Sequence, residues 1–185
     1  MAVRIVWTKQ HKNVLKKLEE TGRYTARKEY ICLDMKEQKD LILTAYDWLS
    51  LHGPKTDQKP ADVQYPVWVS LSEDAIMMPD ENEVILELSL DDSLITLINV
   101  TKWGMILNYS YIPKDEADAK TLQKILELYG TSDAQAVMTP FYPQIRREVI
   151  ASWSRLFDDS VLSKNSCYYG TIWEIRKEWI TDIRQ

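Results

Sequence analysis

The sequence has little glycine, histidine or cysteine, and these shortages exclude several kinds of site. Its five glycines stand at positions 22, 53, 104, 130 and 170, and none has the spacing of a phosphate-binding loop or a dinucleotide fingerprint. Two histidines, His11 and His52, leave little for a metal centre or a histidine-based triad. We therefore expect no resident metal.

Cysteines and long apolar runs are equally scarce. Cys32 and Cys167 are too few and too far apart for a disulfide framework or a zinc site, so we expect both to be reduced. No stretch reaches the roughly 18 uninterrupted apolar residues of a membrane span. The opening residues, Met1 to Trp7, lack the apolar segment of a signal peptide. We expect a cytoplasmic protein that has no membrane partner.

Size, charge and aromatic content narrow the class further. The chain has 185 residues, 45% of them hydrophobic and 28% charged, which predicts one domain over residues 1–185. A formal net charge of -5 argues against a broad nucleic-acid-binding face. Seven Trp and ten Tyr stand against two Phe. Because Trp and Tyr keep a polar tip when buried, this composition favours clefts and surfaces over a wholly apolar interior.

Apolar residues at helical spacing predict several amphipathic helices. Thr8 would cap a helix over residues 10–21, which Gly22 would end. Asp34 followed by Glu37 resembles a capping box at the start of the next helix. Further helices are predicted around Trp103, over residues 115–129 and from Pro143 onward.

Strands are expected where β-branched and aromatic residues alternate with polar ones. The expected strands cover residues 3–7, 65–71, 83–90, 94–98, 168–176 and 179–183. Together with the helices, they predict an α+β fold with a mixed or mostly antiparallel sheet flanked by amphipathic helices.

The stretch from Tyr65 to Leu71 is the first candidate for a binding surface. Since strand side chains alternate, Trp68 and Ser70 would share one face, opposite Val67 and Val69. An indole beside a small hydroxyl is typical of a cleft floor, where the ring stacks on a ligand and the hydroxyl orients it. A core tryptophan beside a tolerated serine is the alternative.

Carboxylates are the other candidates for chemistry. Glu174 lies between Trp173 and Ile175, and Glu87 has a similarly apolar setting. A desolvated carboxylate at such a position needs a charged partner or takes up a proton. A solvent-facing glutamate on an edge strand is the alternative for both residues.

Several tryptophan motifs along the chain resemble a known family. They are Val6-Trp7-Thr8-Lys9-Gln10, Ala45-Tyr46-Asp47-Trp48, Pro66-Val67-Trp68, Trp103 with Leu107-Asn108, and Ser152-Trp153 with Leu156-Phe157. In this order they resemble uncharacterised bacterial proteins known only as a domain of unknown function. The resemblance covers most of the chain and implies no activity.

The two ends of the chain are similar to a second group. A strand leading into Thr8, a following helix and Gly22-Arg23-Tyr24 resemble the opening of the ADP-ribosyltransferase superfamily and its RNA 2'-phosphotransferase relatives. The closing run from Gly170 to Ile180 looks like their last strands.

This second resemblance implies an ADP-ribosyltransferase-like fold that uses NAD as its cofactor. It would place Thr8 or Gln10 in contact with NAD, and Trp68 and Ser70 on the floor of the nicotinamide pocket. Glu174 would be the catalytic acid or lie near it.

Three functions remain as hypotheses. The first is an NAD-dependent ADP-ribosyltransferase, of the toxin or phage-defence kind, that modifies a nucleic acid or a protein. The second is a non-catalytic interaction module, an adaptor or antitoxin-like partner, that uses exposed Trp and Tyr as anchors. It is favoured because no Glu-x-Glu or Gln-x-Glu pair opens the last strand. The third, an RNA-processing phosphotransferase-like enzyme, is disfavoured by the acidic composition. The sequence identifies neither the acceptor nor an oligomeric state.

Overall fold

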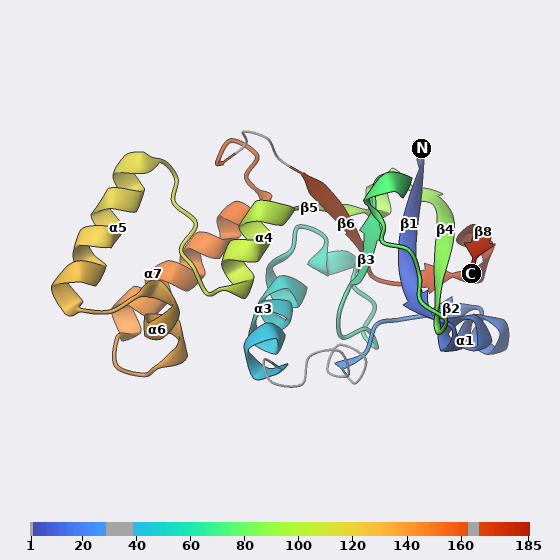
Figure 1. Cartoon of the computed structure of the whole chain (residues 1–185), viewed down its shortest axis with the longest axis horizontal. Coiled ribbons are helices and arrows are strands. Elements are labelled where there is room, and N and C mark those ends of the chain that lie inside the picture. The colour runs from blue at the N-terminus through green and yellow to red at the C-terminus, as the bar shows by residue number, and fades with distance from the viewer. Residues whose placement is uncertain (1, 29–38, 163–166) are drawn as a thin grey trace. The chain divides into compact units, whose positions relative to one another are not determined.

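The computed structural model describes residues 2–28, 39–162 and 167–185 (Figure 1). The chain forms two compact units. Unit 1 combines Met1–Leu97 with Tyr168–Gln185, and unit 2 is Ile98–Cys167. The prediction of one domain over residues 1–185 stays a prediction. The expected Asp34–Glu37 capping box and Cys32 lie outside the described residues.

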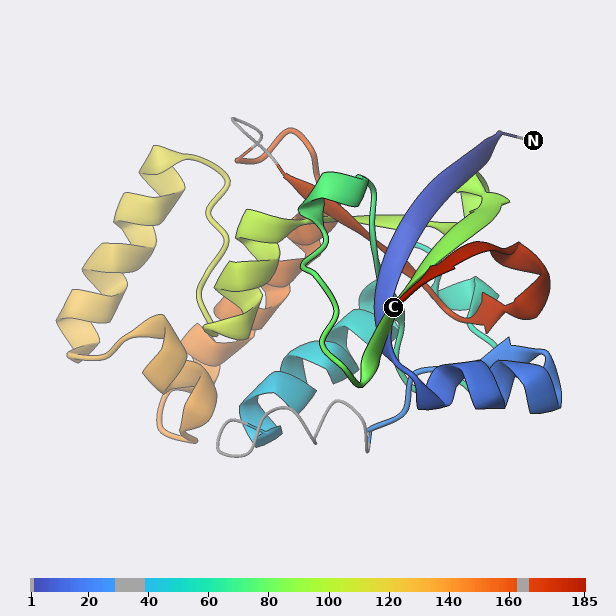
Figure 2. The same cartoon turned by 45° about the vertical axis from the view of Figure 1, so that its right-hand side comes forward.

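The main sheet has six strands in the order β5-β6-β3-β1-β4-β8. These strands are β1 (Val3–His11), β3 (Val67–Ser70), β4 (Glu83–Asp91), β5 (Thr96–Asn99), β6 (Tyr168–Ile172) and β8 (Ile180–Arg184). The pairs β1–β3, β1–β4, β3–β6 and β4–β8 are antiparallel. Figure 2 shows β1 running alongside β4. The α+β fold class and the antiparallel sheet are therefore confirmed.

Strand β1 is longer than predicted. It pairs with β4 from Val3 opposite Asp91 to His11 opposite Glu83, so that Thr8 and Gln10 lie inside the strand. The prediction that Thr8 caps a helix is wrong. A helix cap contributes only about 1 kcal/mol. The pairing of nine residues with β4, together with the burial of Val6 and Thr8, stabilises the strand along its whole length and outweighs the cap.

Helix α1 (Asn13–Thr21) begins after the strand and ends at Gly22, as predicted. Gly22 adopts φ +71° and donates its N–H to the carbonyl oxygen of Leu18 at 2.8 Å. Glycine takes up this left-handed conformation at little cost. The chain therefore reverses at Gly22 and leads directly into the next strand.

A two-stranded ribbon follows this turn. It pairs β2 (Arg23–Tyr24) with β7 (Ile175–Arg176) in antiparallel register. Tyr24 and Ile175 are opposite each other and are buried in the core of unit 1. Because strand side chains alternate, Arg23 and Arg176 point away from that core.

The core of unit 1 lies between α1 and the strands. Its buried members are Val6, Val14, Leu18, Tyr24, Val67, Val69, Val84, Leu86, Leu88, Leu90, Ile95, Ile172 and Ile175. Helix α3 (Lys39–His52) also belongs to unit 1, and its Tyr46 meets the ring of Trp68 edge-on at a centroid distance of 6.3 Å. Short 3₁₀ turns at Thr56–Gln58, Glu73–Ala75, Asp92–Leu94 and Lys177–Trp179 connect the strands and α3.

Unit 2 is helical. It contains α4 (Val100–Leu107), α5 (Glu116–Tyr129), α6 (Asp133–Met138), α7 (Pro143–Ser152) and a 3₁₀ turn at Trp153–Phe157. Asp115 caps α5 and Gly130 ends it, which confirms the predicted helix. The six residues of α6 were not predicted, because so short a helix shows little periodicity.

A buried lysine joins α4 to the 3₁₀ turn at Trp153–Phe157. Lys102 is 0% exposed, and its Nζ donates to the carbonyl oxygens of Arg155 at 3.1 Å and Asp158 at 2.6 Å. Burial lowers the pKa of Lys102 below its ordinary value. Among the described residues, no helix combines the length and apolar character needed to cross a membrane.

Candidate functional site

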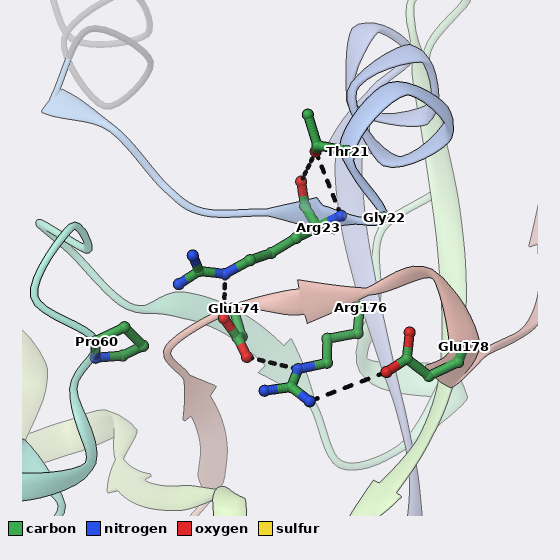
Figure 3. Close-up of a pocket in the computed structure, with 7 residues that line it drawn as sticks. All are labelled: Thr21, Gly22, Arg23, Pro60, Glu174, Arg176 and Glu178. Atoms are coloured by element: carbon green, nitrogen blue, oxygen red, sulfur yellow. Dashed lines mark hydrogen bonds and ion pairs between the residues drawn. The ribbon is translucent and has the colours of Figure 1, made fainter.

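An open hollow of about 500 Å³ lies in unit 1 beside the β2–β7 ribbon (Figure 3). A second, more enclosed hollow of about 250 Å³ shares Pro60, Glu174 and Arg176 with the first. We call the two together the Glu174 hollow. Its other lining residues are Thr21, Gly22, Arg23, Glu178, Gln58, Leu94, Ile172, Trp173 and Trp179.

The turn at Gly22 sets the position of Arg23 in this hollow. The hydroxyl of Thr21 donates to the carbonyl oxygen of Arg23 at 2.7 Å. The carbonyl oxygen of Gly22 accepts the N–H of Lys177 at 2.9 Å, just beyond the end of β7. The first bond holds the turn before β2, and the second joins the two strands at the ribbon's end, so the backbone that carries Arg23 and Arg176 is fixed there.

Glu174 lies between the two guanidinium groups. It accepts a hydrogen bond from Nε of Arg23 on one oxygen and from Nε of Arg176 on the other, the latter at 2.7 Å (Figure 3). Its residue exposure is 7%, so the solvent-facing alternative is wrong, and the expectation that a desolvated carboxylate here needs a charged partner is confirmed.

The register of the β2–β7 ribbon explains why a carboxylate is needed at this position. Arg23 and Arg176 are directly opposite each other in the β2–β7 pairing, and like charges in that relation repel. Glu174 stands immediately before β7, and its two oxygens accept from the Nε groups of both arginines. Its negative charge therefore separates the cross-strand arginine pair and partly neutralises it.

The outer end of Arg23 binds a second carboxylate. Its two terminal nitrogens donate to the two oxygens of Asp62 at 2.9 and 3.2 Å. We call these two terminal nitrogens the outer fork of Arg23. Their hydrogen bonds to Asp62 are the main cause that raises the pKa of Arg23 and lowers the pKa of Asp62, and burial opposes both shifts. The side chain of Asp62 is 66% exposed, so the pair lies at the rim of the hollow.

Two indole rings stand beside these charges. The guanidinium carbon of Arg176 lies 5.4 Å from the ring centroid of Trp179, within the range of a cation–π contact. Trp173 donates its indole N–H to the carbonyl oxygen of Lys55 at 2.9 Å, which fixes its ring. The Glu174 hollow thus offers a buried carboxylate, two guanidinium groups and two aromatic walls.

The residues expected to contact a cofactor lie on the main sheet. The hydroxyl of Thr8, 2% exposed, donates to the carbonyl oxygen of Trp68 and accepts from the side-chain amide of Gln10, both at 2.8 Å. Trp68 lies against Tyr46, whose pKa is raised by burial, with a hydrogen bond from Trp68 acting in the opposite direction. The structure therefore brings Thr8, Gln10 and Trp68 together.

Ser70 is buried and engaged locally. Its hydroxyl donates to the carbonyl oxygen of Ser72 at 2.5 Å. Among the described residues that line the Glu174 hollow, Thr8, Gln10, Trp68 and Ser70 do not occur. Their role as NAD contacts stays a prediction.

Glu87 has a different role from Glu174. It accepts the indole N–H of Trp7 at 3.1 Å and the hydroxyl of Thr181 at 2.8 Å, and it pairs with Arg184 at 3.4 Å. These partners come from β1 and β8, the two neighbours of β4. Glu87 therefore ties three strands together.

Sequence reasoning missed Arg23, Asp62, Arg176 and Trp179 as members of the site. One signal was available, because a single strand predicted over residues 168–176 would place Glu174 and Arg176 on one face. The structure divides that run into β6 and β7, with Trp173 and Glu174 between them. Arg23 and Asp62 carried no such signal, since their contacts span 151 and 39 positions of the sequence.

Comparison with known proteins adds a family but no activity. Residues 5–181 match the model of the family described as Domain of unknown function (DUF3841). No curated protein matches the chain. No solved structure matches it.

Proposed function

The chain belongs to the family Domain of unknown function (DUF3841), and we propose for it the activity of an NAD-dependent ADP-ribosyltransferase-like enzyme. The observation that carries the proposal is the position of Glu174. It is a buried carboxylate that lines both parts of the Glu174 hollow, between two guanidinium groups and beside two indole rings.

The composition of the hollow fits a dinucleotide. Guanidinium groups bind phosphate oxygens with paired N–H donors, and indole faces stack on planar rings. Arg23 and Arg176 are both wall residues, and Trp173 and Trp179 line the adjoining, more enclosed part. A ligand that carries a diphosphate next to a ring matches this arrangement of charges and aromatic surfaces.

Each residue has a distinct role in the proposed reaction. Bound NAD supplies an ADP-ribosyl group, which is transferred when its bond to nicotinamide breaks. Glu174 accepts a hydrogen bond from a ribose hydroxyl, and its negative charge stabilises the positive charge that develops on the sugar. Arg23 and Arg176 hold the diphosphate, and Trp179 stacks on a planar ring. The acceptor is a nucleic acid or a protein.

The test is an assay for NAD consumption with matched variants. Purified protein is incubated with NAD carrying a labelled adenine, alone and with cell lysate, and both nicotinamide release and label transfer are measured. We expect Glu174→Gln to abolish both. Glu20→Gln removes the same charge from an exposed position of α1 that does not line the hollow, and it should retain most of the activity.

Folding of each variant is checked by its thermal melting curve, so that lost activity is not confused with lost structure. Absence of nicotinamide release, of label transfer and of any NAD-induced rise in the melting temperature of the wild-type protein would contradict the proposal.

An interaction module is the second candidate, and it rests on a surface of unit 2. Leu128, Met138 and Phe141 are exposed by 81%, 56% and 77%. The rings of Tyr129 and Tyr142 meet edge-on at 6.4 Å, which brings the end of α5 beside the start of α7. None of the seven tryptophans of the chain is fully exposed. The anchors of such a module would therefore be these residues of unit 2.

This candidate is tested by crosslinked capture from lysate with three variants. Phe141→Ser should lose a captured protein that Glu174→Gln retains, and Leu51→Ser, a similar change at an exposed position of unit 1, should retain it as well. If Phe141→Ser captures the same proteins as the wild type, the interaction surface is not used.

A further inference from the structure

The contact between Arg23 and Asp62 has the geometry of a ligand contact. Two roughly parallel N–H donors of one guanidinium group meet the two oxygens of one carboxylate at 2.9 and 3.2 Å. The same fork binds a phosphate group in the same way, because two phosphate oxygens have a similar spacing. Asp62 therefore stands where an oxyanion of a ligand could be held.

The rest of Arg23 keeps this fork in place without Asp62. Its Nε donates to Glu174, which is buried and is held in turn by Arg176. This hydrogen bond to a buried, anchored carboxylate orients the guanidinium plane, and the two terminal nitrogens face the rim of the hollow. Releasing Asp62 would leave an oriented pair of donors at the edge of the Glu174 hollow.

Asp62 is also easy to displace. Its side chain is 66% exposed, in the turn where Val63 donates its N–H to Pro60 at 3.0 Å, and Pro60 is itself a wall of the hollow. Ion pairs at exposed positions contribute little to stability, because water and salt screen them. An incoming phosphate can exchange with this carboxylate at small cost to the fold.

We infer that the outer fork of Arg23 is a phosphate-binding site of the Glu174 hollow, and that Asp62 is a built-in competitor that occupies it in the free chain. The inference rests on the proposed function, because it assigns the fork to a phosphate of the nucleotide. Its consequence is autoinhibition, since the ligand must release the turn that carries Asp62 before it binds Arg23.

The test measures binding of inorganic pyrophosphate and of NAD, separately, by calorimetry at fixed salt. Asp62→Asn should tighten pyrophosphate binding about three- to fivefold, the size of an exposed ion pair that no longer has to be broken. Asp57→Asn is the matched control, because it removes the same charge from an exposed position of the same loop. It should change the affinity much less.

Repeating the Asp62→Asn change in an Arg23→Lys variant tests whether the tighter binding depends on the paired donors of Arg23. Arg23→Lys keeps the charge and removes the paired donors, so adding Asp62→Asn to it should produce no more tightening than Asp57→Asn does. Melting curves verify that each variant is folded.

The outcomes separate the inference from the proposed function. Tighter pyrophosphate binding in Asp62→Asn, with no binding or consumption of NAD by any variant, would support the phosphate site and remove the ADP-ribosyltransferase activity. Equal affinities of the wild type, Asp62→Asn and Asp57→Asn for NAD and pyrophosphate would overturn the inference and leave the activity standing. Failure of every variant to bind pyrophosphate would also overturn it.

Discussion

Arg23 and Glu174 form an ion pair although 151 positions of sequence separate them. The pair connects the first hundred residues of the chain with its closing segment, beside the ribbon of β2 and β7. It serves the fold by neutralising the opposed arginines, and it places a carboxylate and two guanidinium groups in one hollow. The residue that the fold needs is therefore also the one on which the proposed function depends.

Loss of this carboxylate should destabilise unit 1. Glu174→Gln leaves Arg23 and Arg176 opposite each other without an anion between them. We expect the free energy of unfolding to fall by about 1–3 kcal/mol, less than for a fully buried pair because both arginines are partly exposed. Urea denaturation measures the change. The double variant Glu174→Gln/Arg176→Gln should recover part of the loss, and a wild-type midpoint for Glu174→Gln would refute the neutralising role.

Lys102 should contribute to the stability of unit 2 through hydrogen bonds to the backbone. Lys102→Met keeps the length of the side chain but leaves the carbonyl oxygens of Arg155 and Asp158 without this donor. Each carbonyl oxygen keeps a backbone donor, the N–H of Asp158 for Arg155 and the N–H of Val161 for Asp158, so the expected cost is that of two lost hydrogen bonds, about 0.5–1.5 kcal/mol each. Guanidinium denaturation should show a loss of that order, while the exposed control Lys124→Met stays near the wild type. An equal or higher stability of Lys102→Met would mean that the cost of burying the ammonium exceeds its bonds.

Stability should depend on pH through Asp118. The pKa of this carboxyl is lowered, first by the backbone N–H of Lys114 and then by the Tyr111 hydroxyl and Arg155, with burial opposing them. A carboxyl whose pKa is lower in the folded state than in the unfolded state stabilises the fold above its unfolded pKa, and that contribution is lost as pH falls through the folded pKa.

Asp118→Asn should therefore be less stable than the wild type at neutral pH, and the difference should shrink as the pH falls below about 4. Urea midpoints measured across this range provide the test. Glu116→Gln, on the exposed surface of α5, should show little difference at any pH. A deficit for Asp118→Asn that stays constant down to the lowest pH would show that charge is not responsible.

Gly170 should not tolerate a side chain. A Cβ at this position would lie 2.7 Å from a methyl group of Ile95 and 2.7 Å from a methyl group of Val69. Since both neighbours are β-branched, Gly170→Ala should lower stability by about 1–3 kcal/mol through overpacking. Gly104→Ala is the control, because it meets nothing within 4 Å in α4 and should stabilise the helix by about 0.5–1 kcal/mol. Thermal unfolding distinguishes the two; equal melting temperatures would contradict the close packing.

Local features of this fold were predictable, and distant pairings were not. Gly22 and Gly130 end their helices as the sequence indicates, because a cap depends on only a few neighbouring residues. Thr8 was assigned to a helix because the pattern around it is locally that of a cap, whereas the pairing of β1 with β4, more than 70 residues away, decides its structure. Glu174 was found because a charge in an apolar run is visible in one segment.

The partners of Glu174 could not be found in the same way. Arg23 follows a glycine and Asp62 lies in a polar loop, and nothing in the sequence around either residue indicates that the two are in contact. Only the register of the ribbon brings Arg23 beside Arg176. Thr8, Gln10, Trp68 and Ser70 were selected for their residue types, but type does not determine which hollow a side chain lines. Which residues line a hollow depends on tertiary contacts, and these are known only once the fold is known.

The division of unit 1 between two stretches of chain has a consequence for its synthesis. Strands β6, β7 and β8 all follow residue 167, and they bring Glu174, Arg176 and Trp179 with them. While the ribosome is still translating unit 2, the emerging polypeptide has Arg23 and Pro60 but no opposing wall. A nascent chain therefore has no complete hollow, and whatever this protein binds there can be captured only once translation has passed its last strands.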